Sequence, residues 1–318
     1  MIKSIFKTKL GEAINAEANE YMTKRIKDES IDLIITSPPF ALITKKGYGN
    51  KNQDEYMDWF KGFIDNFKRI LKPKGSLVID IAGTWIEGQP SKSLIHLEIP
   101  MILCKEYDFN LAQDFFWWNT NKLPSPAEWV TIRRERVKDA VNNIWWFSKD
   151  PHPKADNTKV LKEYSKAQMG LFEEGKFTNT GKRPSAHKVS KNFSNKNEGS
   201  IPPNVIKVDD FGGEVPTNLF DLGNSRTSAY NEYCREKKLE IHPAKFPQQI
   251  PEFFIKMLTD KGDKVYDPFG GSCTTGVAAE GLGRKWICTD LEREYLLGAK
   301  GWFGEDYLKA INKKKKRK

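Results

Sequence analysis

The segment at residues 36–40, Thr-Ser-Pro-Pro-Phe, joins hydroxyl groups, two prolines and an aromatic ring directly after a mostly apolar run. Adjacent prolines continue neither a strand ladder nor a helix interior, because they lack N–H donors and have a fixed φ. On this rigid backbone, Ser37 Oγ and the Pro38 carbonyl can both accept hydrogen bonds from one NH₂ group. Phe40 offers a flat face to a planar ring. The segment, with Pro39 as part of its rigid backbone, therefore predicts a site for a ring-bound amine. The alternative is that the segment only ends the preceding strand.

A second segment, Asp-Pro-Phe-Gly-Gly-Ser at residues 267–272, follows a short predicted strand and opens a helix of small residues. Glycines let a ligand approach the backbone, and the helix N-terminus offers free N–H groups. Roughly 20 residues later the next strand ends at Asp290, where nucleotide-binding sheets place an acid that accepts hydrogen bonds from ribose hydroxyls. The segment therefore predicts a nucleoside site.

Neither the GxGxxG spacing nor the Gly-Lys-Ser/Thr of a P-loop is present in this second segment. Its acids suit a ligand with a ribose, an adenine and a positive centre better than a pyrophosphate. S-adenosyl-L-methionine fits that description. The alternative is a structural glycine turn in which Asp290 caps a helix.

Two strand–helix–strand units must carry these segments. Residues 31–36 predict a strand that is apolar on both faces, residues 53–71 place aromatic side chains at helical spacing, and residues 76–81 predict the next strand. Residues 263–268 and 285–290 predict two more strands around the small-residue helix. The expected fold is α/β, with a doubly wound, mostly parallel sheet that brings both segments to the carboxyl edge of its strands.

The composition, 38% hydrophobic and 30% charged residues in a chain of 318, is ordinary for a globular protein. The net charge is +10, and the terminal run at residues 313–318 supplies six of these charges. This balance hints at a polyanionic partner, although a solvated tail is the alternative. No apolar stretch approaches membrane-spanning length, and residues 1–20 lack a signal peptide's apolar core. Four scattered cysteines and four scattered histidines predict a cytoplasmic protein with no metal site and no disulfides.

Residues 150–241 break the α/β pattern with many Pro, Asn, Gly, Ser and Lys residues and little periodicity. Seven basic residues stand against one acid between residues 175 and 208. A long irregular insertion in a compact domain is usually functional or disordered. The residues alone leave open a surface loop or a lobe that faces a polyanion.

Together, TSPPF at residues 36–40 and DPFGGSCTTG at residues 267–276 resemble the amino-group DNA methyltransferases. The order of the motifs, with a variable basic region between them, is similar to the permuted β class of that family. KLPSPAEWV at residues 122–130 and HPAKFPQQIPEFF at residues 242–254 extend the resemblance over most of residues 30–300. The resemblance implies a circularly permuted fold of S-adenosylmethionine-dependent methyltransferase type, with an irregular target-recognition insertion.

The resemblance also implies a division of the chain and a set of site residues. Residues 1–149 and 242–312 would form the catalytic and cofactor-binding parts of one domain, residues 150–241 the target-recognition region, and residues 313–318 a basic tail. The implied catalytic residues are Ser37, Pro38, Pro39 and Phe40. The implied cofactor-binding residues are Asp267, Phe269, Gly270, Gly271 and Ser272 on the loop, Asp290 at the ribose, and Lys245 and Pro247 over the methionine end.

Family members with serine first in the amine-binding motif mostly methylate N4 of cytosine, so the resemblance implies transfer to a flipped-out cytosine in double-stranded DNA. Phe40 would stack on that base, with Trp117 and Trp118 as further candidates and core packing as their alternative. Methylation of ring C5 is disfavoured, because it needs a thiolate nucleophile, usually in a Pro-Cys turn that this chain lacks. The alternatives are methylation of adenine N6 by the same fold, action of that fold on RNA or on a protein amide, and a non-catalytic DNA-binding role.

Basic and amide side chains are the candidates for DNA contact, because phosphates attract cations and base edges pair with Arg, Asn and Gln. A restriction endonuclease that acts on the same DNA without a stable complex is a possible functional partner. The candidate DNA-binding residues are Lys45, Lys46, Lys182, Arg183, Lys188, Asn204 and Arg226.

Overall fold

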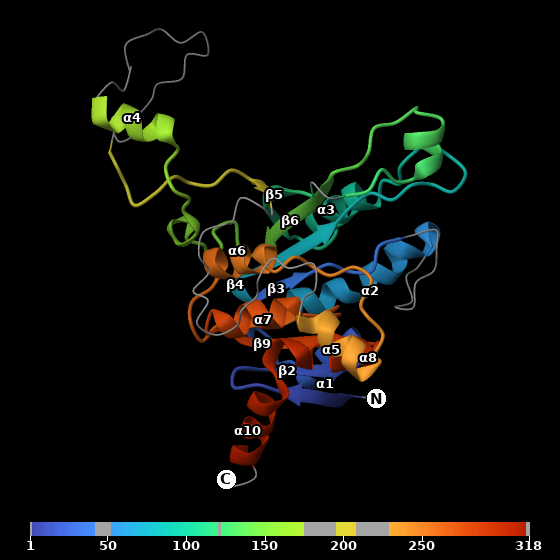
Figure 1. Cartoon of the computed structure of the whole chain (residues 1–318), viewed down its shortest axis with the longest axis vertical. Coiled ribbons are helices and arrows are strands. Elements are labelled where there is room, and N and C mark those ends of the chain that lie inside the picture. Colours follow the sequence, from blue (N-terminus) through green and yellow to red (C-terminus); the bar gives the residue numbers. More distant parts are fainter. Residues whose placement is uncertain (1, 42–51, 120–121, 175–194, 208–228, 316–318) are drawn as a thin grey trace. The chain divides into compact units, whose positions relative to one another are not determined.

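A computed structural model describes the chain except for residues 1, 42–51, 120–121, 175–194, 208–228 and 316–318 (Figure 1). The described residues form two compact units, one made of residues 1–155 and 204–318 and the other of residues 156–203. In these described ranges, no helix has both the length and the apolar character that crossing a membrane requires.

The larger unit is built on a sheet of nine strands in the order β1-β2-β9-β8-β3-β4-β6-β5-β7. Five neighbouring strands, from β2 to β4 in this order, run parallel, while β1 and β6 pair antiparallel with their neighbours. The mostly parallel α/β sheet predicted from the sequence is confirmed. The strands are β1 Lys3–Lys7, β2 Gly11–Asn15, β3 Ile31–Thr36, β4 Leu71–Ile81, β5 Asn110–Trp118, β6 Val141–Ser148, β7 Val205–Lys207, β8 Lys264–Asp267 and β9 Lys285–Asp290.

Helices cover both faces of this sheet: α1 and α3 pack against α2 on one face, and α6 packs with α7 on the other (Figure 1). The helices of the larger unit are α1 Ala18–Arg25, α2 Gln53–Ile70, α3 Ile95–Lys105, the π-helix η1 Glu128–Ile132, α5 Ala229–Lys237, α6 Gln249–Leu258, α7 Thr274–Gly281, α8 Arg293–Gly298, α9 Lys300–Phe303 and α10 Glu305–Lys315. Because α10 continues to Lys315, the first three lysines of the predicted basic tail belong to a helix.

Side chains of the central strands point alternately to the two faces of the sheet, and a layer of helices covers each face. All six residues of β3 are buried, as the two-faced apolar pattern predicted. On one face Ile34 joins a core cluster with the aromatic side chains that α2 places at helical spacing, among them Tyr56, Phe60 and Phe67. Helix α2 ends at Ile70, one residue before the predicted end, and β4 begins at once with Leu71, which pairs with Ile31 before the register shifts. The predicted strand at residues 76–81 is the regular part of β4.

The smaller unit contains η2 Asn157–Val160 and α4 Lys166–Glu174. Lys162 and Ser200 form an isolated antiparallel bridge within it. Tyr164 packs edge-on against Phe172, with ring centroids 4.9 Å apart, and its hydroxyl accepts a hydrogen bond from the Asn197 backbone N–H. This unit lies inside the irregular insertion identified in the sequence.

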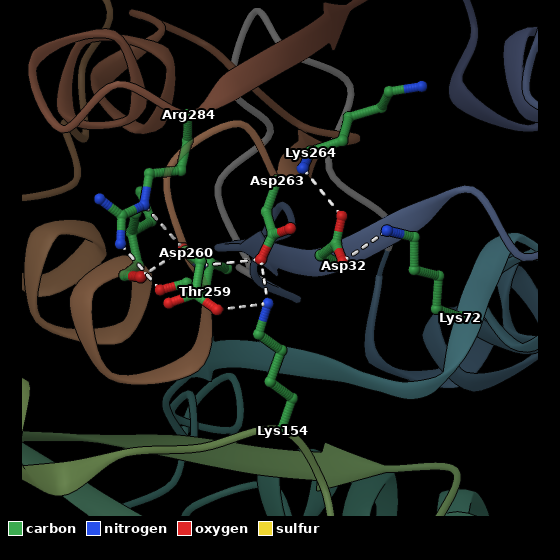
Figure 2. Close-up of polar contacts among 9 residues, drawn as sticks. Asp32, Lys72, Lys154, Thr259, Asp260, Asp263, Lys264 and Arg284 are labelled. Atoms are coloured by element: carbon green, nitrogen blue, oxygen red, sulfur yellow. Dashed lines mark hydrogen bonds and ion pairs between the residues drawn. The ribbon is translucent and has the colours of Figure 1, made fainter.

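Polar contacts join the strands at the opposite edge of the sheet from the two motifs (Figure 2). Asp32, near the start of β3, accepts a hydrogen bond from the Lys264 backbone N–H at 2.9 Å and forms a 2.7 Å ion pair with Lys72. Lys154 forms ion pairs with Asp260 and Asp263 at 2.8 and 2.5 Å. These contacts satisfy polar groups where β3, β4 and β8 begin. Through Lys154 they also hold the segment that follows β6 at the same edge.

Substitution of Asp32 tests how far this edge stabilises the fold. Asp32→Ala leaves the Lys264 N–H without its carboxylate partner, so we expect the free energy of unfolding to fall by about 2 kcal/mol. Lys264→Met is the matched control, because Asp32 binds the backbone of Lys264 while the Lys264 side chain points away (Figure 2). Urea denaturation followed by circular dichroism measures both variants. Equal losses in the two variants would contradict this assignment.

Candidate active site

The two sequence motifs line one cavity of about 240 Å³ at the carboxyl edge of the sheet. Strands β3 and β8 are parallel neighbours, so the turns that follow them open side by side. Ser37, Pro38, Pro39 and Phe40 form one part of the wall, and residues 267–272 form another. The topology thus brings together segments that lie more than two hundred residues apart in the chain.

Asp267 connects the two motifs directly. Its Oδ1 accepts a 2.7 Å hydrogen bond from Thr36 Oγ1, the residue before Ser37, and its Oδ2 accepts a 2.7 Å bond from Thr275 Oγ1 in α7. The Phe269 backbone N–H also donates to this carboxylate. Burial raises the pKa of Asp267 to about 6, and these three hydrogen bonds counteract that rise. The main effect of Asp267 is therefore to hold β3, the glycine turn and α7 in one arrangement.

Two glycines let the turn after β8 lie close to its neighbours. A Cβ on Gly270 would stand 2.8 Å from Cβ of Cys288 in β9. Gly271 has a φ of +48°, and a Cβ there would collide with the His242 ring. Glycine is therefore required at both positions, by close packing at Gly270 and by packing and backbone conformation together at Gly271.

Asp290, at the end of β9, lies on the same cavity. Its two carboxylate oxygens accept backbone hydrogen bonds from Gly271 at 2.7 Å and Glu292 at 2.8 Å. Each carboxylate oxygen can accept a second bond, so acceptor capacity remains for ligand hydroxyls. Burial raises the pKa of Asp290 to about 6, against the effect of the two N–H donors.

Aromatic rings form a further wall of the cavity. Phe269 packs edge-on against Phe63 at 5.2 Å between centroids and lies 5.6 Å from Trp59, both from α2. All three side chains line the cavity. A flat aromatic wall next to a carboxylate with free acceptor sites suits an adenosine, whose ring stacks and whose ribose donates hydrogen bonds.

A buried carboxylate also lies behind the amine-binding motif. Asp80, near the end of β4, accepts a 3.1 Å hydrogen bond from Ser37 Oγ. Its other oxygen accepts a 3.4 Å bond from the Asn142 amide of β6. Burial raises the pKa of Asp80 to about 7, although both hydrogen bonds and the positive charge of Lys122 act in the opposite direction. With its proton directed at Asp80, the Ser37 oxygen can present lone pairs to a ligand amine.

Comparison with known proteins agrees with this geometry. Residues 31–301 match the N6_N4_Mtase family, described as DNA methylase. The chain belongs to this DNA methylase family. Type II methyltransferase M.PvuII of Proteus hauseri is 46% identical over 85% of this chain and 76% of its own length.

Solved structures agree with the family assignment. The cytosine-N4-specific PvuII DNA methyltransferase superimposes with a TM-score of 0.73 and 36% identity, over 98% of this chain and 94% of that one. The complex of M1.HpyAVI with S-adenosylmethionine (SAM) shares the fold, with a TM-score of 0.52 and 20% identity over 92% of this chain and 98% of the other. The expected permuted methyltransferase fold is confirmed.

S-adenosylmethionine is the cofactor of this methylase. The cavity fits it: Asp290 has acceptor sites for ribose hydroxyls, Gly270 and Gly271 line the wall without side chains, and Trp59 and Phe63 offer aromatic faces. When bound, the cofactor supplies an electrophilic methyl group.

Most of the sequence-predicted site residues of the methylase meet at this cavity. Lys245 and Pro247 are not among the cavity-lining residues, whereas their neighbours Ala244 and Phe246 are. The Lys245 ammonium donates to Asn231 of α5 at 2.7 Å. The residues that line the cavity as predicted are Ser37, Pro38, Pro39, Phe40, Asp267, Phe269, Gly270, Gly271, Ser272 and Asp290.

Among the residues predicted to contact DNA, the structure describes only Asn204. Asn204 uses its amide nitrogen within the methylase, donating to the Asp114 carbonyl at 3.0 Å beside β7. Of the further stacking candidates, Trp117 is half-buried and Trp118 exposed, and neither lines the cavity. The other candidates lie outside the described residues: Lys45, Lys46, Lys182, Arg183, Lys188 and Arg226.

Sequence reasoning missed Asp80, Trp59 and Phe63 as site residues, along with Glu17 and His242. Asp80 carried a usable signal, because an acid within the apolar strand SLVIDI is rarely buried without a function or a partner. The aromatic residues of α2 carried no such signal, because aromatic side chains at helical spacing are equally typical of a buried core.

Removal of the Thr36 hydroxyl tests the connection between the motifs. Thr36→Val keeps the side-chain shape but deletes one of three donors to the buried Asp267 carboxylate, which loosens the cofactor turn. We expect the affinity for S-adenosylmethionine to fall about tenfold, measured by isothermal titration calorimetry. Thr131→Val, at an exposed threonine of η1, is the control. Wild-type affinity in Thr36→Val would show that the bond does not support the turn.

Proposed function

We propose that this methylase transfers a methyl group from S-adenosylmethionine to N4 of a flipped-out cytosine in duplex DNA. The observation that carries the proposal is the shared cavity, in which the amine-binding segment at residues 37–40 and the cofactor turn at residues 267–272 face one space. The choice of cytosine N4 draws support from the PvuII enzyme, whose specificity is of that kind.

Positioning is the first contribution of the protein. Ser37 Oγ and the Pro38 carbonyl accept hydrogen bonds from the exocyclic NH₂ and orient its nitrogen lone pair toward the methyl group. Phe40, half-buried against the core and exposed to the cavity, stacks on the base. Ordering of the amine before reaction lowers the entropic part of the barrier.

Proton removal is the second contribution. The nitrogen gains a bond to the methyl carbon as the bond from that carbon to sulfur breaks, so the nitrogen must lose one hydrogen as a proton. Ser37 Oγ takes this proton while its own hydroxyl proton passes to Asp80 Oδ2, along the 3.1 Å hydrogen bond. A pKa of about 7 leaves much of Asp80 ionised and able to accept a proton near neutral pH.

We also propose that the methylase protects DNA within a restriction–modification system, with an endonuclease that acts on the same DNA without a stable complex. The type II designation of the PvuII relative supports this assignment. Residues 1–149 and 242–312 would supply the catalytic domain, residues 150–241 the recognition of sequence, and residues 313–318 a basic tail. The compact unit at residues 156–203 supports a separate recognition role for the middle of that region.

Nucleoside analysis tests the reaction and the base. The protein is incubated with S-adenosylmethionine and unmethylated genomic DNA, and the digested DNA is analysed by mass spectrometry. We expect N4-methylcytosine. N6-methyladenine would replace the target base while leaving the fold and the amine chemistry in place, and the absence of any methylated base with intact cofactor binding would refute the proposed function.

Removal of the Ser37 hydroxyl tests the amine site. Ser37→Ala loses both the acceptor for the amine and the path to Asp80, so we expect the single-turnover transfer rate to fall at least about 10²-fold. Affinity for S-adenosylmethionine, measured by equilibrium dialysis, serves as the control for folding and should stay near the wild-type value. A full transfer rate in Ser37→Ala would exclude this role.

A further inference from the structure

A line of polar side chains continues from Asp80 away from the cavity. Asn142, near the start of β6, donates its amide N–H to Asp80 Oδ1 at 3.4 Å. The oxygen of the same Asn142 amide accepts a 3.2 Å hydrogen bond from the Lys122 ammonium. One amide thus joins a buried carboxylate to a lysine that follows β5, with each donor facing an acceptor.

The antiparallel pairing of the strands produces this arrangement. The end of β4 lies beside the start of β6, where Ile81 pairs with Asn143. The end of β5 lies on the other side of the start of β6. The connection from β5 to β6 therefore leaves the sheet at the edge that holds the amine site. Lys122 stands at the beginning of this connection, and its backbone carbonyl accepts a hydrogen bond from Lys138 near its end.

We propose that Lys122 is a positioning residue for methyl transfer, which acts through Asn142 to keep Asp80 ionised and oriented to receive the proton from Ser37. The inference rests on the proposed function, because it concerns the group that takes the proton from the target amine. Lys122 itself touches neither Ser37 nor the cavity wall in the described contacts.

Electrostatics support this role. The charge of Lys122 lowers the pKa of Asp80 against the larger, opposite effect of burial. Burial in turn lowers the pKa of Lys122, whereas the carboxylates of Asp139 and Asp80 favour its charged form and Lys92 disfavours it. Asp139 and Lys92 form a 2.6 Å ion pair, so much of their effect on Lys122 cancels. Among the described residues, Ser37 and Asn142 thus act on Asp80 through hydrogen bonds, and Lys122 acts on it through its charge.

The pH dependence of transfer follows from the sign of these effects. A carboxylate that accepts a proton works only when ionised, so the wild-type rate should fall as pH drops through the pKa of Asp80 near 7. Loss of the Lys122 charge removes an influence that lowers this pKa. The acidic limb of the profile should then move to higher pH, with the rate recovering in alkaline buffer.

Single-turnover methyl transfer to unmethylated genomic DNA, measured from pH 5.5 to 9.5 with radiolabelled S-adenosylmethionine, tests the inference. In Lys122→Met we expect the acidic limb to shift upward by about one pH unit, which is about tenfold in rate at pH 6. Lys122→Arg keeps the charge and should restore most of the wild-type profile. Lys61→Met, at a surface lysine of α2 paired with Glu106, is the matched control and should leave the profile unchanged.

Other outcomes of the same experiment would overturn the inference. A uniform loss of rate in Lys122→Met with an unmoved limb would assign Lys122 a purely structural role. A higher rate at low pH would mean that protonated Asp80 is the active form. Asn142→Ala gives a second test if Lys122→Met fails to fold, since it breaks the same line and should shift the limb in the same direction. An inactive wild-type protein would refute the proposed function instead, which separates the two failures.

Discussion

The hydrogen bond between Thr36 and Asp267 is the contact on which the site depends. It joins the last residue of β3 to the last residue of β8, and thereby joins the amine-binding segment to the cofactor turn. A buried carboxylate is costly unless hydrogen bonds compensate its lost hydration, and Asp267 has three donors. These hydrogen bonds keep β3, the turn and α7 together, and so hold the amine-binding segment beside the cofactor turn.

Two buried carboxylates lie near the ends of β8 and β4, the strands on either side of β3, and their roles differ because their partners differ. The donors to Asp267 are a threonine on each side and a backbone N–H, all within the framework. Asp80 has one donor, Ser37, that also lines the cavity. The first carboxylate therefore organises the wall, and the second is connected to whatever binds at Ser37. The environment, and not the residue type, separates the acid that holds the framework from the acid that contacts Ser37.

The two edges of the sheet divide stability from function. At the amino edge, Asp32 and Lys154 contact backbone and charged groups of neighbouring elements (Figure 2). At the carboxyl edge the turns are occupied by glycines, prolines and acids that leave backbone and side-chain groups available to ligands. Parallel strands place all their following turns on one side, so a methyltransferase of this fold gathers its site there whatever the order of the motifs in the chain.

The sequence by itself determined the four central strands β9, β8, β3 and β4, the two motifs and the edge at which they meet. The two-faced apolar pattern of residues 31–36, the helical spacing after residue 53 and the glycine turn after Asp267 are local signals, and each corresponds to β3, α2 and the turn before α7. Parallel topology then left one place for the motifs to converge. For that reason the sequence alone predicts Ser37 and Asp290 at this edge, where both line the cavity.

Only the tertiary structure decided which side chains complete the site. Asp80 meets Ser37 across two strands, and Lys122 reaches Asp80 through Asn142 from a third and a fourth element. Nothing in the spacing of these residues distinguishes them from other acids, amides and lysines, because contacts between strands depend on register. Lys245 shows the converse: its motif predicts a cofactor contact, yet its ammonium lies on Asn231 of α5. Local patterns determine elements, whereas the partners of a buried charge are set by how those elements pack.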